Sequence, residues 1–272
     1  MRNIGVFPYY GGKFHLLPHL LKLFPPHRNF IDLFGGGGCV ILNKKPCRGE
    51  EIYNDLNGQL SNFFKVISKK PLFDIFLERL EWLPPAGIEQ FMAYKKEMLS
   101  EALSDIDRAI ITFYLLHLSF SGGIDSSSSI GRGTRGERLQ NKIKMMKRIH
   151  QRFSKIFIEN RDFKKCLELH RGDFLVYADP PYLHSTRKEI HSYKEYEMSN
   201  SDHEDLINLL IDYEGKVVLS GYNNDLYRRL EDVNWRRIDI PVKITASRFH
   251  KNDKRVESIW MNPRCERKGL LF

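Results

Sequence analysis

The residues best suited to chemistry are Asp179-Pro180-Pro181-Tyr182, which follow the apolar run 174–178 where a buried strand is expected to end. Open α/β sheets bind their ligands at the carboxyl ends of strands. The Asp179 carboxylate and the Pro180 carbonyl can accept hydrogen bonds from both hydrogens of an exocyclic amino group, and Tyr182 offers a ring to stack on a flat heterocycle. The prolines restrict the backbone and hold these acceptors in place. Taken alone, the segment is also typical of a strand that ends in a simple proline turn.

A glycine-rich turn and an acidic residue stand earlier in the chain. The expected strand 29–34 runs into glycines 35–38, where the backbone can approach a ligand closely. Val40 replaces the third glycine of the dinucleotide fingerprint, which argues against NAD. Asp55 follows a second expected strand, 51–54, about 20 positions beyond the turn, where an acidic residue can receive ribose hydroxyls. Alternatively it is the N-cap of the helix expected over residues 56–67, and both roles can hold at once.

The composition predicts a basic protein with reduced cysteines. The 272 residues carry 43 Lys+Arg against 34 Asp+Glu, a formal net charge of +9 that suits a polyanionic partner. The four cysteines form no CxxC pair, and no metal-ligand spacing with the histidines is found, so no metal is expected. The longest nearly apolar run, 109–120, is too short to span a membrane, and prolines and glycines near residue 10 argue against a signal peptide. We therefore expect a cytoplasmic protein.

Residues 69–152 read as a helical insertion between two α/β segments, because apolar residues recur there at helical spacing without a strand pattern. The loop over 119–136 is rich in Gly and Ser, and basic residues run from Arg132 to Lys155. Such a run is usually a solvated helix face, but beside this loop it resembles a phosphate-contacting surface with base-reading side chains. The candidate DNA contacts are Arg132, Arg135, Arg138, Lys144 and Lys147.

The α/β pattern returns after the insertion. Asp162-Phe163 is expected to open a short helix, and residues 184–199 form either a lid or a long loop. The expected elements are strands 155–159, 174–178 and 216–220, a helix around 206–210, and a closing hairpin over 235–242 and 256–261. The basic segment 251–255 lies inside this hairpin, where it can reach nucleic acid.

The order of these segments resembles that of Dam-type DNA adenine N6-methyltransferases, which use S-adenosylmethionine (SAM) as the methyl donor. The resemblance spans nearly the whole chain and rests on the motifs in order: Tyr9 to Lys13, Asp32 to Gly38, Asp55, the helical insertion, Asp162-Phe163, and Asp179 to Tyr182. It implies a Rossmann-like α/β fold with a mostly parallel sheet of seven strands, the last one reversed.

The resemblance also implies which segments of the chain bind SAM and which recognise the target DNA. Residues 1–68 and 153–272 would form the SAM-binding catalytic domain, and residues 69–152 the target-recognition domain. Asp179, Pro180 and Tyr182 would be catalytic, and the partner would be double-stranded DNA, bound by a monomer. The residues implied for SAM binding are Tyr9, Lys13, Asp32, Gly35, Gly37, Asp55, Asp162, Phe163 and Asp179.

Several alternatives stay open. A cytosine N4-methyltransferase would bind its amino group in the same kind of pocket, but such enzymes more often have Ser at the position of Asp179. Methylation of RNA or of a protein glutamine is a further alternative. From a different class, the chain could be an inactive scaffold that regulates by binding DNA. Loop 119–136 does not align with the hairpin of enzymes that recognise GATC, so the target sequence stays open.

Overall fold

The computed structural model describes residues 4–9, 12–83, 87–119, 135–183, 196–243 and 254–266. Contacts divide the chain into two compact units, each assembled from separate segments. The sheet unit comprises His15–Phe34, Lys44–Leu56 and Arg161–Phe272, and the helical unit comprises Met1–Phe14, Gly35–Asn43 and Asn57–Asn160.

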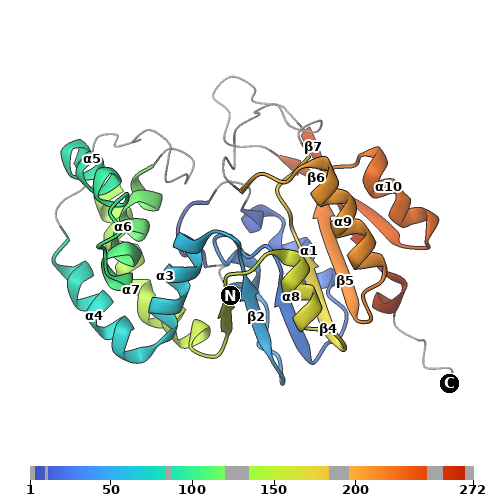
Figure 1. Cartoon of the computed structure of the whole chain (residues 1–272), viewed down its shortest axis with the longest axis horizontal. Helices are drawn as coiled ribbons and strands as arrows, with labels where there is room; N and C mark the ends of the chain where they lie inside the picture. Colours follow the sequence, from blue (N-terminus) through green and yellow to red (C-terminus); the bar gives the residue numbers. More distant parts are fainter. Residues whose placement is uncertain are drawn as a thin grey trace. The chain divides into compact units, whose positions relative to one another are not determined.

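One mixed sheet organises the α/β part of the chain (Figure 1). Its strands are β1 Asn29–Asp32, β2 Glu51–Asn54, β3 Phe157–Glu159, β4 Phe174–Ala178, β5 Lys216–Gly221, β6 Arg236–Lys243 and β7 Lys254–Met261. They lie in the order β3-β2-β1-β4-β5-β7-β6. β1 pairs in parallel with β2 and β4, β4 pairs in parallel with β5, and β7 runs antiparallel to both β5 and β6. The expected seven-stranded α/β sheet with a reversed last strand and a closing hairpin is therefore confirmed.

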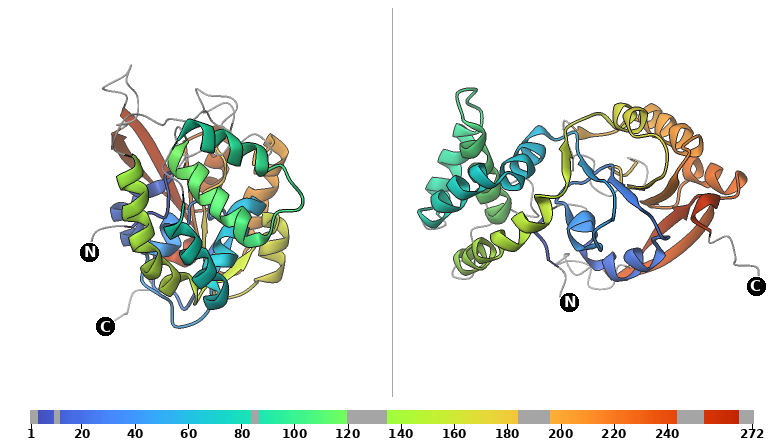
Figure 2. Two further views of the ribbon diagram at one scale, coloured as in Figure 1. Left: turned by 90° about the vertical axis from the view of Figure 1, so that its left-hand side faces the viewer. Right: turned by 90° about the horizontal axis from the view of Figure 1, so that it is seen from below.

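The central strands are buried along their length, as expected for parallel strands covered on both faces. Val176 of β4 packs into a core formed with α8 Phe163–Leu169, α9 Asn200–Ile211 and α10 Asp225–Asp232. Its neighbour Tyr177 points to the opposite face, where its ring lies 5.7 Å from that of Phe24, at the end of α1 Leu17–Leu23. The alternation of side chains thus places helices on both faces of the sheet (Figure 2).

Two of these helices begin with well-defined caps. α9 opens with a capping box between Ser199 and Asp202. α10 begins after Asn224, whose side-chain oxygen accepts a hydrogen bond from the backbone N–H of Tyr227 at 2.9 Å. The sequence pattern did not predict α10, because its charged residues leave only a narrow apolar stripe.

The helical unit is built mainly from packed helices. They are α2 Cys39–Asn43, α3 Gly58–Ser68, α4 Lys70–Glu81, α5 Ile88–Glu97, α6 Asp105–Leu118 and α7 Arg135–Phe153. The rings of Phe63 on α3 and Phe113 on α6 stack with centroids 6.1 Å apart, and Phe64 stacks on Phe153 of α7 at 4.4 Å. These contacts place α3 in the same unit as the later helices. The long segment of the helical unit therefore begins at Asn57, and not after residue 68 as the sequence indicated. No helix in the described part of the chain is both long and apolar enough to cross a membrane.

Candidate active site

The ends of the parallel strands bring polar side chains to one edge of the sheet unit. Asp32 is the last residue of β1 and Asn54 the last residue of β2, while Asp179 directly follows β4 and Ser220 lies next to the end of β5. Because these strands run in parallel, their carboxyl ends share one edge, which is where such sheets bind ligands. The Asp-Pro-Pro-Tyr segment therefore lies where the sequence predicted it.

The hydroxyl of Ser220 on β5 holds Asp179 directly, and the hydroxyl of Tyr177 on β4 contacts Ser220. The Ser220 hydroxyl donates a hydrogen bond to Asp179 Oδ1 at 2.8 Å, and Tyr177 Oη lies 2.9 Å from Ser220 Oγ. Tyr177 and Ser220 are buried, and Asp179 is half-buried. Burial and the negative charge of Asp179 raise the pKa of Tyr177 well above its ordinary value, so this phenol stays protonated.

Tyr182 is held at both its hydroxyl and its ring. Its hydroxyl lies 2.8 Å and 3.0 Å from the two carboxylate oxygens of Glu257 on β7, to which it donates. Its ring lies against that of Tyr222, with centroids 4.5 Å apart and planes inclined at 54°. Pro180 is buried beside it. Glu257 and Tyr222 were not predicted from the sequence. Tyr222 directly follows β5, and the antiparallel pairing of β5 with β7 brings Glu257 to the same edge.

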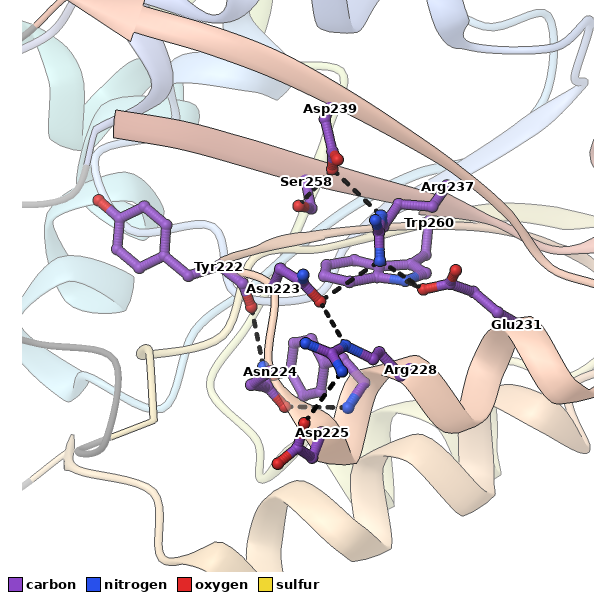
Figure 3. A network of polar contacts seen from close by, with 11 residues as sticks. Tyr222, Asn223, Asn224, Asp225, Arg228, Glu231, Arg237, Asp239, Ser258 and Trp260 are labelled. Carbon is purple, nitrogen blue, oxygen red and sulfur yellow. Dashed lines mark hydrogen bonds and ion pairs between the residues drawn. The ribbon is translucent and has the colours of Figure 1, made fainter. Parts of the chain in front are cut away.

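A network of polar contacts supports the segment that carries Tyr222 (Figure 3). The Asn224 side chain donates to the Tyr222 carbonyl at 2.8 Å, and Asn223 Oδ1 accepts from two arginine side chains at 3.3 Å and 3.4 Å. Charged and polar groups on α10, β6 and β7 extend the network, namely Arg228, Glu231, Arg237, Asp239 and Ser258. The network ties the segment after β5 to the closing hairpin.

The ends of β1 and β2 are tied to the segment before α8 by Asn54. Its amide nitrogen donates to the carbonyls of Leu33 at 3.0 Å and Arg161 at 3.1 Å, and its oxygen accepts from the Arg161 N–H at 3.1 Å. Asp162 then caps α8 by accepting from the Lys164 N–H at 2.8 Å, as the sequence predicted. From the sequence, Asn54 was predicted only as a strand residue.

Phe163, Asp32 and Asp55 complete the predicted set in the sheet unit. Phe163 is buried, with its ring 5.8 Å from that of Phe34. Asp32 is only 2% exposed, whereas Asp55 is half-buried directly after β2. These side chains combine an aromatic surface with carboxylates, which suits a cationic ligand that carries hydroxyl groups.

The capping interpretation of Asp55 is wrong. The N-cap of α3 is Asn57, whose side-chain oxygen accepts from the backbone N–H of Gln59 at 2.9 Å and of Leu60 at 3.3 Å. The helix begins later than its apolar pattern indicated, because Leu56 is exposed and outside it. The helix cap therefore gives no reason for an acidic residue at position 55.

In the helical unit the glycine turn packs tightly against aromatic rings. Gly36 has a φ of +48°, and a Cβ there would lie 2.8 Å from Cε1 of Tyr9. Gly38 has a φ of +67°, and a Cβ there would lie 2.9 Å from the rings of both Phe64 and Phe153. The left-handed backbone and these rings require glycine at both positions. The approach of a ligand, which was the only reason predicted for these glycines, is therefore not needed to explain Gly36 and Gly38.

The remaining predicted SAM contacts also belong to the helical unit. Gly35 opens the turn, and its carbonyl accepts from the Gly38 N–H at 2.8 Å. A Cβ at Gly37 would lie 3.1 Å from Cβ of Tyr9. Lys13 starts the short 3₁₀ helix Lys13–His15 and is only 5% exposed. The turn leads into α2, whose few residues give it little macrodipole with which to hold an anion.

The predicted DNA contacts are described in part. Lys144 and Lys147 lie exposed on α7, while Met146 and Ile149 of the same helix are buried, so the helix has a cationic face and an apolar face. Arg135 and Arg138 belong to α7, but their side chains lie outside the described residues. The residues outside the described part also include Arg132 with most of loop 119–136, residues 184–195 of the predicted lid or loop, and 251–253 of the basic segment.

The strand order, the reversed β7 and the Asp-Pro-Pro-Tyr segment after β4 define a Rossmann-like methyltransferase fold. Residues 9–244 match the model of the D12 class N6 adenine-specific DNA methyltransferases. The chain belongs to this family, which confirms the resemblance of its motifs.

Three proteins similar to this chain are named as methylases or methyltransferases. It is 28% identical over 192 residues to modification methylase StsI of Streptococcus sanguinis, covering 65% of this chain and 28% of that protein. It is 28% identical over 180 residues to the DNA adenine methylase of Haemophilus influenzae, covering 63% of this chain and 61% of that protein. It is 27% identical over 118 residues to the DNA N-6-adenine-methyltransferase of Escherichia phage P1, covering 43% of this chain and 15% of that protein. These matches span less than two thirds of each relative's length.

Proposed function

We propose that the chain is a site-specific DNA adenine N6-methyltransferase that transfers the methyl group of SAM to an adenine flipped out of duplex DNA. The observation that carries this proposal is the anchored pair at the carboxyl edge of the sheet, in which Ser220 holds Asp179 at 2.8 Å and Glu257 holds Tyr182. Family membership supports adenine as the base. We place the enzyme in the cytoplasm as a monomer that binds double-stranded DNA.

The chemistry follows from the acceptors at this edge. The adenine amino group is inaccessible within a duplex, so the base must leave the stack before it can react. Its amino lone pair is delocalised into the ring and is therefore a poor nucleophile. The Asp179 carboxylate and the Pro180 carbonyl would accept hydrogen bonds from the amino hydrogens and localise the lone pair on nitrogen. Tyr182 would stack on the base, which contributes about 1–3 kcal/mol. The rate gain then comes from placement and local electrostatics.

The residues present fit SAM, whose positively charged sulfonium supplies an electrophilic methyl group when bound. The buried Asp32 carboxylate and the half-buried Asp55 and Asp179 lie at strand ends of the sheet unit, where they suit a cation and ribose hydroxyls. Phe163 and Asp162 would flank the adenine ring of SAM. The resemblance assigns further contacts to residues of the helical unit, namely Tyr9, Lys13, Gly35 and Gly37.

The direct test is to incubate the purified chain with methyl-labelled SAM and duplex DNA of mixed sequence, followed by nucleoside analysis and mapping of modified sites. N6-methyladenine at a defined sequence supports the proposal. N4-methylcytosine, or label in RNA or protein, would instead support one of the alternative methyltransferases. Binding of SAM and DNA without transfer would point to the inactive regulator.

We predict that Asp55→Ala lowers the affinity for SAM about 10- to 100-fold, because lost hydrogen bonds at a partly buried site cost about 1–3 kcal/mol. Isothermal titration calorimetry measures the change. The matched control is Asn57→Ala, which removes the α3 cap two residues away. It should lower the melting temperature while leaving SAM affinity unchanged. An Asp55→Ala chain that binds SAM normally would refute the ribose assignment.

We predict that removing Lys144 or Lys147 weakens binding to all duplex sequences alike, because exposed lysines on α7 would neutralise phosphates. Each substitution by Ala should reduce the slope of log K against log salt by about one unit. The control is Lys96→Ala, which removes an exposed lysine from α5 and should leave the slope unchanged. Equal slopes for Lys144→Ala and wild type would remove α7 from the DNA-binding surface.

The preference for a particular DNA target sequence should depend on other residues, which lie in or beside loop 119–136. We propose that Arg132 or Arg135 reads a base, so its loss would relax the preference at one position of the target by about 1–3 kcal/mol. Mapping methylated sites after deletion of residues 125–129 and 132–135 tests this assignment. An unchanged site preference would place base reading elsewhere, with residues 251–255 as the next candidate.

A further inference from the structure

We propose that Ser220 and Tyr177 are positioning residues for Asp179, joined to it by a chain of hydrogen bonds that runs from Tyr177 through Ser220 to the carboxylate. The inference rests on the proposed function, because it gives these two residues a role through the group that would contact the adenine. Neither residue belongs to the Asp-Pro-Pro-Tyr segment, and Ser220 comes from the neighbouring strand β5.

Proton counting fixes the direction of the chain. An ionised carboxylate only accepts hydrogen bonds, so the single proton of the Ser220 hydroxyl is committed to Asp179 Oδ1 at 2.8 Å. Tyr177 Oη, 2.9 Å from Ser220 Oγ, must then be the donor to Ser220. The raised pKa of Tyr177 keeps that proton on the phenol. Each hydrogen bond polarises the next one, which strengthens the final bond to the carboxylate.

The two hydroxyls are fixed by the rigid part of the sheet. Tyr177 is 1% exposed and Ser220 is 0% exposed, so water cannot readily replace either hydrogen bond. Their strands are paired in register, with Tyr177 opposite Val218 and Ala178 opposite Leu219. A group held by packed residues on central strands keeps its orientation better than a group on a loop.

The consequence for Asp179 is a fixed carboxylate plane. Asp179 follows the last residue of β4, where the chain leaves the sheet and backbone pairing no longer orients the side chain. The bond from Ser220 to one carboxylate oxygen restricts rotation of the whole group. An amino hydrogen can be accepted efficiently only when the acceptor lies within about 10–20° of the productive direction. Ser220 would supply that restriction without touching the substrate.

The test is a double-mutant cycle measured as the single-turnover rate of adenine methylation at saturating SAM and DNA. Ser220→Ala should lower this rate about 10- to 100-fold, because a hydrogen bond to a charged group is lost. Tyr177→Phe should lower it about two- to fivefold, since Tyr177 acts only through Ser220. The double variant should match Ser220→Ala alone, and Ser220→Cys, which keeps a weak donor, should recover part of the rate.

Other measurements separate positioning from general damage to the fold. The loss of SAM affinity in Ser220→Ala, measured by calorimetry, should be smaller than the loss of rate, because Asp179 keeps its charge beside SAM while its alignment with the adenine amino group is lost. The matched control is Ser61→Ala, which also removes a buried serine hydroxyl and its hydrogen bond to a carbonyl, but in the helical unit. It should lower the melting temperature without slowing methyl transfer.

The outcomes are distinct. A Ser220→Ala rate within about twofold of wild type, or a double variant whose loss equals the product of the two single losses, would overturn the positioning chain while the proposed function stands. A wild-type chain that methylates no adenine would overturn the proposed function, and the positioning role with it.

Discussion

Asp179→Ala is expected to lower the rate of adenine methylation at least about 100- to 1,000-fold, the loss typical of removing one preorganised electrostatic group. In the proposed site the Asp179 carboxylate, at the end of β4, is the charged acceptor for the adenine amino group, and the Ser220 hydroxyl donates to it at 2.8 Å. Single-turnover kinetics with labelled SAM measure the loss. The variant should remain folded, because Asp179 is only half-buried.

The same strand offers a control. Asp173 precedes β4 at its other end and is exposed, and its ion pair with Lys216 spans 3.6 Å, so Asp173→Ala should change the rate little. Asp179→Asn separates charge from shape, since the amide keeps one acceptor oxygen but not the negative charge. Wild-type rates for Asp179→Ala would show that the catalytic assignment is wrong.

Glu51→Ala is expected to destabilise the sheet unit by about 3–5 kcal/mol, because it leaves a buried charge without its partner. Lys44 Nζ lies 2.5 Å from Glu51 Oε1, and the two side chains are only 3% and 4% exposed. Lys44 also lies 4.5 Å from the centroid of the Phe30 ring and donates to the Lys45 carbonyl at 2.8 Å. Urea unfolding followed by circular dichroism measures the loss.

An exposed ion pair of equal length provides the comparison. Lys70 and Asp74 on α4 are also 2.5 Å apart, but their side chains are 69% and 54% exposed. Asp74→Ala should cost less than about 1 kcal/mol. Replacing both buried partners, as in Lys44→Met with Glu51→Leu, should recover most of the stability lost in Glu51→Ala. Equal costs at the buried and exposed pairs would contradict the role of burial.

Most of the fold was predictable because its strongest signals are local. Residues 174–178 form one apolar run, and they become the fully buried β4. The closing hairpin and the helix after Asp162 also followed from short patterns. α10 was missed because charged residues interrupt its apolar stripe, and the start of α3 was misplaced because exposed Leu56 continues the apolar pattern beyond the helix.

The positions of Asp179 and Tyr182 were predictable, because a local motif directly follows the apolar run of β4. The contacts that distant segments make with them were not. In the sequence, Ser220 looks like an ordinary strand residue. Only the register of β4 and β5 shows that it lies beside Asp179. In the sequence, Glu257 looks like a surface charge. Only the antiparallel pairing of β7 with β5 shows that it lies beside Tyr182. These contacts depend on pairings between strands far apart in sequence, which no local pattern records.

The pairing of β1 with β4 has a consequence for how the protein is made. Asn29, at the start of β1, donates to the carbonyl of Asp173, which is 144 residues later in the chain. At about 5–20 residues per second, a ribosome needs roughly 7–30 s to synthesise that interval. During this time β1 and β2 have been made, but β4, the second pairing partner of β1, has not. Asn57–Asn160, the longest segment of the helical unit, is made within the interval. Until β4 arrives, β1 in the nascent chain has one unpaired edge, which is a template for wrong pairing.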